Sequence, residues 1–211
     1  MALLSSPTDA RRPGISRLFD FGEFPALSGS RVTLCELDRE DARDVFGFRG
    51  DPEVQRYNGV PDSTLQDTRR FIEGRRELYR NEREVTWGIR SKETGCVIGG
   101  ICLFDRDRYH RHAQIGYDLA RAHWGEGLAS ESIRLVLGFG FERMLLKRVE
   151  IWTSTANARS LKLAERLGFQ REGTLRRRIL EDDGQFYDCA VFGLLRGEWA
   201  ASEGVAQSVH R

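Results

Sequence analysis

The sequence predicts a single α/β or α+β domain, in which about four helices flank a mixed sheet of about seven strands. Several short segments alternate apolar and polar residues, and this period of two is typical of half-buried strands. Other segments repeat their apolar residues with the period of a helix. In the middle of the chain, an expected strand, a loop with two glycines and an expected helix follow one another directly.

The first part of the chain is predicted to form a strand and then helices. Residues 31–37 form the strand, after which Asp38 caps the next helix. The Asp-Pro pair at residues 51–52 marks a break. A capping box at residues 63–66 then opens a helix that ends near Arg80.

Strands dominate the next part. They are expected at residues 85–90 and 96–104, where the apolar residues first alternate and then form a nearly continuous run. Gly99 and Gly100 inside the second strand indicate a bulge or a close backbone contact. A charged loop then leads to a third strand at residues 114–119.

The glycine loop follows this strand and suits an anion. It contains Gly125 and Gly127, and the helix expected at residues 128–144 has its apolar residues on one face. The free N–H groups and the dipole at a helix start attract phosphate, and glycine lets the backbone approach it closely. A strand-to-helix turn that needs glycine only for flexibility is the alternative.

The last part is predicted to contain three strands and one helix. A strand at residues 148–154 precedes a helix that Asn157 caps and Gly168 ends. Strands at residues 175–180 and 186–195 flank an acidic turn with an Asp-Gly pair, which is typical of a hairpin.

Residues 1–30 are expected to be an N-terminal extension of a domain that spans residues 31–199, and residues 200–211 a C-terminal tail. The extension contains several glycines and prolines, but it has more aromatic residues than a solvated tail needs. We expect residues 15–24 to pack on the domain or on a second copy of it, so a homodimer is possible. A mobile tail is the alternative.

The composition limits the classes of function. Of the 211 residues, 40% are hydrophobic, which is enough for a core, and 31% are charged with a net charge of +1. This balance argues against a nucleic-acid or membrane-surface binder, since both need a basic excess. No apolar run approaches the roughly 18 residues that span a bilayer, and no signal peptide is evident. We therefore expect a cytoplasmic protein.

The cysteines and histidines show no metal-binding pattern. The cysteines form no C-x-x-C pair and are interpreted as small buried apolar residues in a reducing compartment: Cys35, Cys96, Cys102 and Cys189. The four histidines have neither the spacing of a catalytic triad nor that of metal ligands. We expect no bound metal.

Four motifs in the second half of the chain share one family pattern. The loop at residues 124–129 reads Trp-Gly-Glu-Gly-Leu-Ala. It resembles the acyl-CoA pyrophosphate loop of the GNAT superfamily of N-acetyltransferases, in the branch of the RimJ and RimL enzymes, although the wider superfamily has Gln or Arg at the position of Trp124. Residues 157–161 and 165–173 resemble its N-x-x-S and E-x-L-G-F-x-x-E-G signatures, and the end of the chain is similar to its closing hairpin. The resemblance covers residues 31–199 in the family's order.

This resemblance implies a GNAT-like domain with acetyl-CoA as its cosubstrate. The residues implied for acetyl-CoA binding lie at the end of the strand, in the glycine loop and at the N-x-x-S motif: Tyr117, Asp118, Leu119, Trp124, Gly125, Glu126, Gly127, Leu128, Ala129, Ser130, Asn157 and Ser160. The backbone of the strand end is expected to pair with the amides of pantetheine.

The resemblance also implies that Ser160 donates a proton to the departing thiolate. A serine that only helps its helix start is the alternative, and the tyrosine that other GNAT branches place on this helix is Ala164 here. Glu150 is the candidate general base, with a purely structural, solvent-facing role equally open. Glu131 is interpreted as a carboxylate that compensates the helix dipole, and residues 181–183 as a solvated acidic turn.

We predict an acetyl-CoA-dependent N-acetyltransferase whose acceptor is a primary amine, first of all the N-terminal α-amine of a protein or peptide. Deprotonating an α-amine costs about 1.4 kcal/mol at neutral pH, whereas a lysine costs about 4.6 kcal/mol. A weak base therefore suffices for N-termini. The alternatives are an acetyltransferase for a small amine, such as an antibiotic or a polyamine, and a catalytically silent acyl-CoA-binding module.

Overall fold

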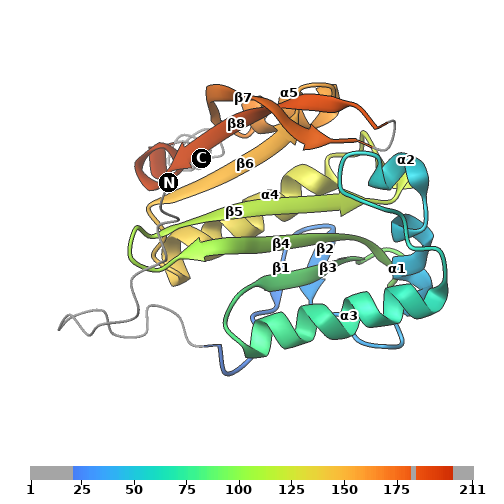
Figure 1. Cartoon of the computed structure of the whole chain (residues 1–211). Helices are drawn as coiled ribbons and strands as arrows, with labels where there is room; N and C mark the ends of the chain where they lie inside the picture. Colours follow the sequence, from blue (N-terminus) through green and yellow to red (C-terminus); the bar gives the residue numbers. More distant parts are fainter. Residues whose placement is uncertain (1–20, 182–183, 202–211) are drawn as a thin grey trace.

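The computed structural model describes residues 21–181 and 184–201, which form one α/β domain around a single mixed sheet (Figure 1). The eight strands lie in the order β1-β2-β3-β4-β5-β6-β8-β7. They span Leu27–Ser28 (β1), Val32–Cys35 (β2), Val85–Ser91 (β3), Val97–Asp107 (β4), His112–Leu119 (β5), Arg148–Ser154 (β6), Gln170–Leu180 (β7) and Phe186–Leu195 (β8). Only β5 and β6 pair in parallel. The mixed sheet is confirmed, with one strand more than expected because β1 is too short to show a pattern.

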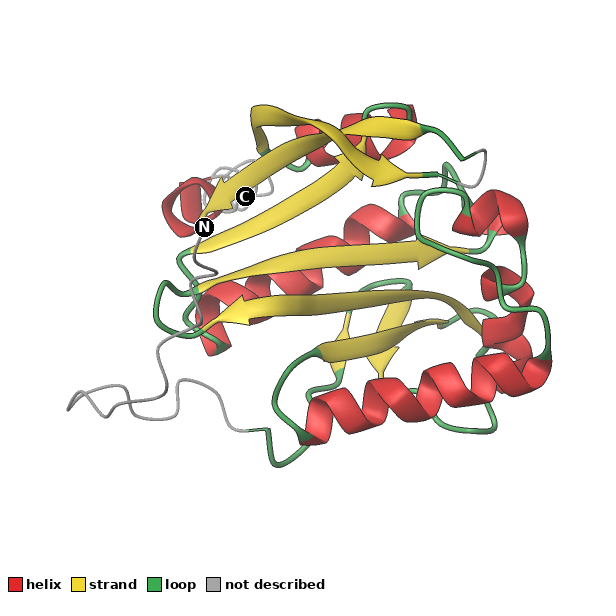
Figure 2. Ribbon diagram, in the orientation of Figure 1, coloured by secondary structure: helices red, strands yellow, loops and turns green. Residues whose placement is uncertain are grey.

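Helices cover both faces of this sheet, with α3 in front of the strands and α4 behind them in Figure 2. They span Ala42–Arg49 (α1), Pro52–Gln55 (α2), Leu65–Arg80 (α3), Leu128–Gly138 (α4) and Ala158–Arg166 (α5). Ile133 of α4 and Leu163 of α5 belong to the main core, whereas Val45 of α1 and Ile72 of α3 form a second cluster with Val97. The predicted fold class is therefore confirmed.

Two of the predicted helix starts are wrong by a few residues. The helix α3 is capped by Thr64, whose hydroxyl accepts from the N–H of Asp67, while the carboxylate of Asp67 accepts from the N–H of Thr64. The capping box therefore lies one residue later than predicted. Asp38 does not cap α1, because that helix starts at Ala42; its carboxylate accepts from the N–H groups of Glu40 and Asp41 in the preceding turn.

The prediction for Gly99 and Gly100 is confirmed. A Cβ atom on Gly99 would lie 2.5 Å from the carbonyl oxygen of Asp118 on β5, and one on Gly100 would lie 3.0 Å from the carboxylate of Asp118. The register between β3 and β4 also shifts near this point, between Ile89 and Arg90. Because both glycines lack a side chain, β4 and the end of β5 can approach closely enough to seat the Asp118 carboxylate against the backbone.

The described end of the N-terminal extension packs on the domain. The ring of Phe21 lies 5.1 Å from that of Tyr79 on α3, and the hydroxyl of Tyr79 donates to the carbonyl oxygen of Glu23 at 2.8 Å. The indole N–H of Trp87, on β3, donates to the carbonyl oxygen of Pro25 at 2.6 Å. This segment therefore covers two core aromatics. Residues 15–20 of the predicted arm lie outside the described residues, and the homodimer stays a prediction.

Removing residues 1–28 is expected to lower the melting temperature by at least about 5 °C. The deletion exposes Tyr79 and Trp87, and burying one large apolar side chain is worth about 1.5–3 kcal/mol. In a domain of this size, 1 kcal/mol shifts the melting temperature by about 2–4 °C. Thermal unfolding, monitored by circular dichroism, measures the effect, and a variant that lacks only residues 1–20 assigns it to residues 21–28, which include β1. Equal melting temperatures for the 1–28 deletion and the full chain would show that the extension is passive.

The four cysteines are all free. Cys189 is buried, but Cys96 is exposed, because it follows directly on the turn at Gly95. The prediction of a buried role is therefore wrong for Cys96. Among the described residues, no helix is both long and apolar enough to cross a bilayer.

Candidate active site

The parallel strands β5 and β6 separate after a short paired stretch. They pair only over residues 112–114 and 148–150. Beyond it, β5 continues to Leu119 and β6 to Ser154, and Figure 1 shows the two strands diverging. The edge of β5 that faces β6 therefore carries no ladder of backbone hydrogen bonds to that strand. An extended ligand with amide groups can pair with this edge.

The glycine loop lies directly after the separated end of β5. Gly125 and Gly127 have φ angles of 82° and 81°, in the left-handed region that favours glycine, and α4 begins at Leu128. Among the described residues, no acceptor is found for the backbone N–H groups of residues 125–130. Free N–H groups at the start of a helix, together with its dipole, favour an anion. The predicted geometry of a phosphate loop is present.

Three arginines surround this loop, and sequence reasoning did not identify them. Arg31 donates to a loop carbonyl oxygen at 2.8 Å, and Arg166 donates to the hydroxyl of Ser130 at 3.1 Å. The guanidinium of Arg159 lies 4.0 Å from the centroid of a Trp124 ring. They come from the start of β2 and from α5, so only the tertiary structure brings them to the loop. Their charge complements a polyphosphate.

The side chains of the loop itself are mainly structural. The indole N–H of Trp124 donates to the carbonyl oxygen of Leu119 at 2.6 Å, which ties the loop to the end of β5. Leu128 is buried, Ala129 packs against the core, and Glu126 is exposed. If this loop binds acetyl-CoA, its contribution comes from the backbone.

Glu131 holds the start of β2. Its carboxylate accepts from the N–H and guanidinium of Arg31 at 2.8 and 3.1 Å, from the hydroxyl of Ser30 at 3.1 Å, and from the N–H of Val32 at 3.4 Å. Burial by itself raises the pKa of Glu131, but these hydrogen bonds together lower it. Its contacts are those of a structural carboxylate.

Asn157 and Ser160 lie across the gap from β5. The Asn157 side chain caps α5 by accepting from the N–H of Ser160 at 3.1 Å, as predicted. The hydroxyl of Ser160 is 2.9 Å from the hydroxyl of Tyr117, so a hydrogen bond joins α5 to β5. Burial raises the pKa of Tyr117, partly offset by this hydrogen bond, and keeps the phenol protonated. The pair thus places two hydroxyl groups at the separated strands.

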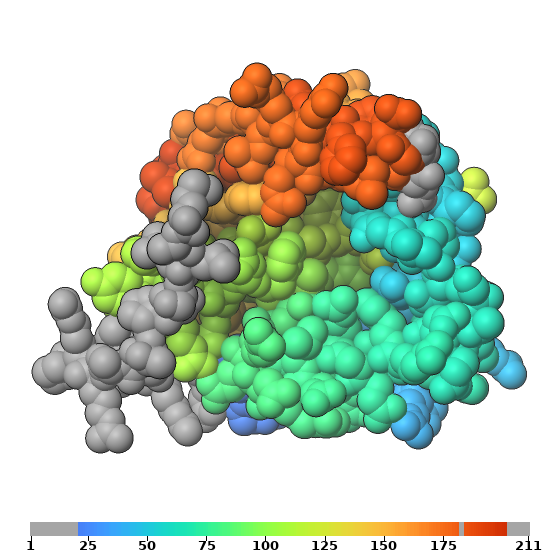
Figure 3. All heavy atoms as spheres, viewed as in Figure 1, coloured from blue at the N-terminus to red at the C-terminus, as the bar shows by residue number. Residues whose placement is uncertain are grey.

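A cavity of about 350 Å³ opens beside this pair. Figure 3 shows the surface hollowed over β4 and β5, between α3 and the C-terminal hairpin. Aromatic side chains dominate its wall, and the polar groups include two arginines and two carboxylates: Phe48, Arg49, Tyr57, Phe71, Arg75, Glu84, Phe104, Tyr117, Asp118 and Trp152. Most of these residues come from α1, α2, α3 and the sheet. The final hairpin, β7 and β8, supplies no lining residue among those described.

Asp118 is the carboxylate at the base of this cavity. One oxygen accepts from the N–H of Gly100 at 2.9 Å and the other from the amide of Gln55 at 3.1 Å. Burial raises its pKa, and these hydrogen bonds offset the rise only in part. Sequence reasoning assigned Asp118 to the cofactor strand by its backbone alone. The position of its side chain, which accepts hydrogen bonds from Gly100 on β4 and from Gln55 and lines the cavity, was not predicted.

The other ionisable groups of the cavity are paired. Both oxygens of Glu84 accept from Arg75, at 2.8 and 2.9 Å, and Arg49 forms a bidentate pair with Asp62 at 3.0 and 2.9 Å. Burial raises the pKa of Cys102 to about 12, so its thiol stays neutral. Among the described lining residues, Asp118 is thus the carboxylate without a cationic partner.

Glu150, the predicted base, lies on β6 and is engaged by its neighbours. Its carboxylate accepts from the guanidinium of Arg148 at 2.7 Å and from the indole of Trp152 at 2.8 Å. Arg148 also pairs with Glu172. Glu150 does not line the cavity itself, but its partner Trp152 does.

The acidic turn is not fully solvated. Glu181 is buried and accepts a hydrogen bond from the hydroxyl of Ser154, because the start of the turn folds back on β6. The prediction is therefore wrong for Glu181. The next two residues of the turn lie outside the described residues.

Comparisons with known proteins identify the family of this chain. A model of the acetyltransferase (GNAT) domain matches residues 31–170. The chain belongs to the GNAT family of acetyltransferases. It is 37% identical to the uncharacterized N-acetyltransferase p20 of Bacillus licheniformis over 176 residues, which cover 82% of this chain and 98% of the relative. It is 33% identical to the uncharacterized N-acetyltransferase YoaA of Bacillus subtilis over 174 residues, with the same coverage.

The fold of this acetyltransferase also matches a solved enzyme of the RimJ type. The structure of Mycobacterium smegmatis RimJ in complex with CoA-disulfide superimposes with a TM-score of 0.75 at 19% identity, and the match covers 85% of this chain and 95% of that one. At this identity the likeness concerns the fold. The predicted family and its RimJ-like architecture are confirmed, and GNAT enzymes use acetyl-CoA as the acetyl donor.

Proposed function

We propose that this acetyltransferase transfers the acetyl group of acetyl-CoA to the N-terminal α-amine of a peptide or protein. One observation carries the proposal. The gap between β5 and β6 has the glycine loop at its end and opens on the side of β5 into a cavity with Asp118 at its base. Acetyl-CoA extended along the gap would thus have its phosphates at the glycine loop and its thioester near the cavity that contains Asp118.

The donor would bind with its pyrophosphate on the backbone N–H groups of the glycine loop. Arg31 and Arg166 lie beside these groups and would add charge–charge attraction. The pantetheine arm would pair with the edge of β5 that faces the gap, where the carbonyl oxygens of Tyr117 and Leu119 already accept from the side chains of Asn58 and Trp124. This position places the thioester sulfur close to the hydroxyl groups of Ser160 and Tyr117. Asn157 would hold the arm in addition to its capping role.

Asp118 is the group that we propose as general base. It lies on the cavity side of β5, one residue after Tyr117, and its raised pKa gives it basicity closer to that of an amine. It would accept a proton from the ammonium of the acceptor, and the neutral amine that results would attack the thioester carbonyl. The developing oxyanion would face the backbone N–H groups of the separated strand. Glu150 stays a second candidate on the opposite strand.

The charges in the cavity favour an acceptor with a single ammonium. The carboxylate of Glu84 is neutralised by Arg75. Asp118 is therefore the carboxylate that can attract the ammonium group of an incoming acceptor. A polyamine carries several ammonium groups and needs several carboxylates. The aromatic wall instead suits the side chain of an N-terminal residue. Relatives are named for both acceptor classes: a putative ribosomal N-acetyltransferase of Bacillus subtilis at 33% identity and a spermidine N(1)-acetyltransferase of Escherichia coli at 25%.

The proposal is tested by thiol release from acetyl-CoA with three panels of acceptors: short peptides with free N-termini, polyamines and aminoglycosides. Peptides should react fastest, and blocking the peptide N-terminus should abolish the reaction even when a lysine is present. Faster turnover with a polyamine or an aminoglycoside would assign the small-amine class. Tight binding of acetyl-CoA without thiol release in any panel would mark a silent binding module.

Replacing Ser160 by alanine is expected to lower kcat up to about 100-fold and to leave the affinity for acetyl-CoA nearly unchanged. General acid catalysis is worth about 10²–10⁴-fold, and the lower end applies because a thiolate with a pKa of about 8.5 leaves well unaided. Steady-state kinetics and calorimetry separate the two effects. Tyr117→Phe is the companion variant, because it removes the other hydroxyl of the pair and shows which of the two affects kcat. Weaker acetyl-CoA binding with intact kcat in Ser160→Ala would make the serine a capping residue.

A further inference from the structure

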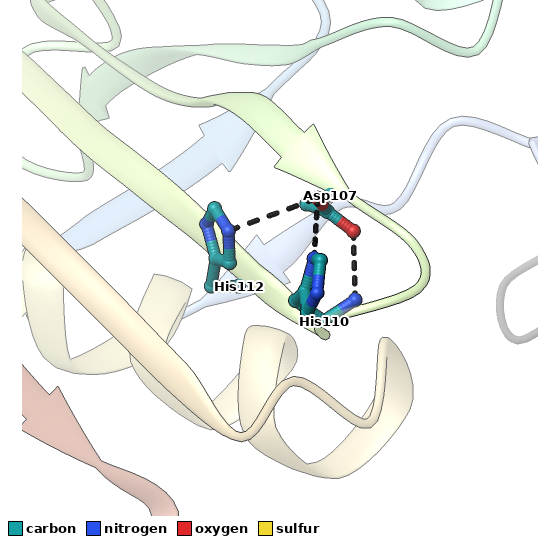
Figure 4. Close-up of side chains that lie close together, drawn as sticks. All are labelled: Asp107, His110 and His112. Atoms are coloured by element: carbon teal, nitrogen blue, oxygen red, sulfur yellow. Dashed lines mark hydrogen bonds and ion pairs between the residues drawn. The ribbon is translucent and has the colours of Figure 1, made fainter. Parts of the chain in front are cut away.

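The turn between β4 and β5 brings together Asp107, His110 and His112 (Figure 4). Asp107 is the last residue of β4 and His112 the first of β5, and the two are partners in the antiparallel register. His110 lies in the turn between them. One carboxylate oxygen and one ring nitrogen from each histidine all lie within 4.8 Å of one another.

The backbone holds these side chains on one side of the turn. The N–H of His110 donates to one oxygen of Asp107 at 2.7 Å, and the ring Nδ1 of His110 lies 2.9 Å from the other oxygen. Arg111 has a φ angle of 57°, so the chain reverses sharply between the two histidines. Their rings are stacked at 25° with centroids 6.3 Å apart. The arrangement therefore exists before any ligand arrives.

The ring of His112 lacks hydrogen bonds on both nitrogens among the described residues. Its Nε2 lies 3.9 Å from the carboxylate of Asp107, which is beyond hydrogen-bond distance. Its Nδ1 is buried and has no partner among the described residues. A gap of 3.9 Å is too long for a hydrogen bond, and a shift of about 0.6 Å would bring the two atoms to the separation of neighbouring ligands on one tetrahedral metal ion.

The geometry points to a binding site for a divalent transition-metal ion, with Zn²⁺ as the ion to test first. Its ligands are Oδ2 of Asp107, Nδ1 of His110 and Nε2 of His112, and water completes the coordination. Two imidazoles and one carboxylate suit Zn²⁺, Ni²⁺ and Cu²⁺ better than Mg²⁺ or Ca²⁺, which prefer oxygen ligands alone. A tetrahedral zinc site separates its ligand atoms by about 3.3 Å, within the range found here.

The neighbouring cations are held away from this site. Arg108 forms an ion pair with the carboxylate of Glu82, and Arg106 donates to the carbonyl oxygen of Glu82 at 2.9 Å. The guanidinium of Arg106 also lies 4.7 Å from the centroid of the Phe21 ring. Within the part of the chain that the structure describes, the two imidazoles are the only cationic-type groups paired with the carboxylate of Asp107.

The site lies at the opposite end of β5 from the acetyl-CoA loop. His112 and Leu119 are the two ends of this strand, and eight residues of antiparallel strand extend over about 25 Å. A metal ion there would not take part in acetyl transfer. It would instead crosslink the last residue of β4, the turn and the first residue of β5, and so stabilise the hairpin that carries Tyr117 and Asp118 at its far end.

Isothermal titration of the tag-free full chain, stripped with a chelator, with ZnCl₂ tests this site. We expect one Zn²⁺ per chain and a rise in melting temperature on binding. His110→Ala should weaken the affinity at least about 10-fold and cancel the thermal shift, because His110 is a proposed ligand. Its side chain is mostly exposed, so the variant is expected to fold. Asp107→Asn should weaken binding similarly.

His123→Ala is the matched control, because this histidine lies beyond the far end of β5 and should leave the zinc affinity unchanged. The absorption spectrum with Co²⁺ adds a second readout, since nitrogen and oxygen ligation gives no thiolate charge-transfer band and so excludes the exposed Cys96. Absence of saturable binding would overturn the proposal. Equal affinity for Zn²⁺ in His110→Ala and the unmodified chain would overturn it as well.

Discussion

Replacing Gly127 by valine is expected to weaken acetyl-CoA binding at least about 100-fold. Gly127 has a φ angle of 81°, and a β-branched residue in this region strains the backbone by about 1–3 kcal/mol. A Cβ atom would lie 3.4 Å from the guanidinium of Arg31, so the cause is backbone strain more than lack of space. Relief of the strain turns the N–H groups away from the pyrophosphate. Calorimetric titration with CoA measures the affinity.

Gly138→Ala is the control for this variant. Gly138 lies in α4 with ordinary helical backbone angles, and a Cβ atom there would meet nothing within 4 Å. It should bind CoA as the unmodified chain does and melt at the same or a slightly higher temperature. A folded Gly127→Val protein with unchanged affinity for CoA would remove the glycine loop from the donor site.

Replacing Asp118 by asparagine is expected to lower kcat by about 10²–10⁴-fold, the usual contribution of a general base. The asparagine keeps the size of the side chain and an oxygen for the N–H of Gly100, so the fold and the acetyl-CoA affinity should change little. Initial rates with a peptide acceptor measure the loss. Glu150→Gln is measured beside it, and a larger loss in that variant would move the base to β6.

The pH dependence gives an independent check on Asp118. Burial raises its pKa, so the carboxylate becomes protonated and inactive as a base when the pH falls through this raised value. The rate constant kcat should therefore rise with pH over a range above the ordinary titration of aspartate. In Asp118→Asn this rise of kcat with pH, the acidic limb of the profile, should disappear while the slow residual rate persists. A limb that is identical in both proteins would belong to another group.

The features that sequence reasoning predicted correctly depend on short segments. The glycine loop, the Asn157 cap and the start of α4 are each encoded within a few residues, and the local pattern determines their geometry. The fold class follows from the periods of the strands and helices. The capping box of α3 was misplaced by one residue because Ser63 and Thr64 are equally good caps, and only the contact with Asp67 distinguishes them.

The features that were missed depend on register and on distant segments. Which face of β5 carries the Asp118 carboxylate follows from its pairing with Gly100, 18 residues earlier in the chain. Arg31 approaches the glycine loop across 95 residues. The histidines seemed unrelated because their spacing matches no metal motif, yet the β4–β5 register places Asp107 opposite His112. No local pattern contains this information.

The short pairing between β5 and β6 makes the sheet two half-sheets with a hinge between them. Strands β1 to β5 form one antiparallel unit and β6 to β8 another, and three residue pairs join their backbones. A donor that pairs with the free edge of β5 and contacts α5 bridges both units. Saturation with a ligand at 100 times its Kd stabilises a fold by about 2.7 kcal/mol. Here that stabilisation would be concentrated at the hinge, so amide hydrogen exchange should slow first at residues 115–119.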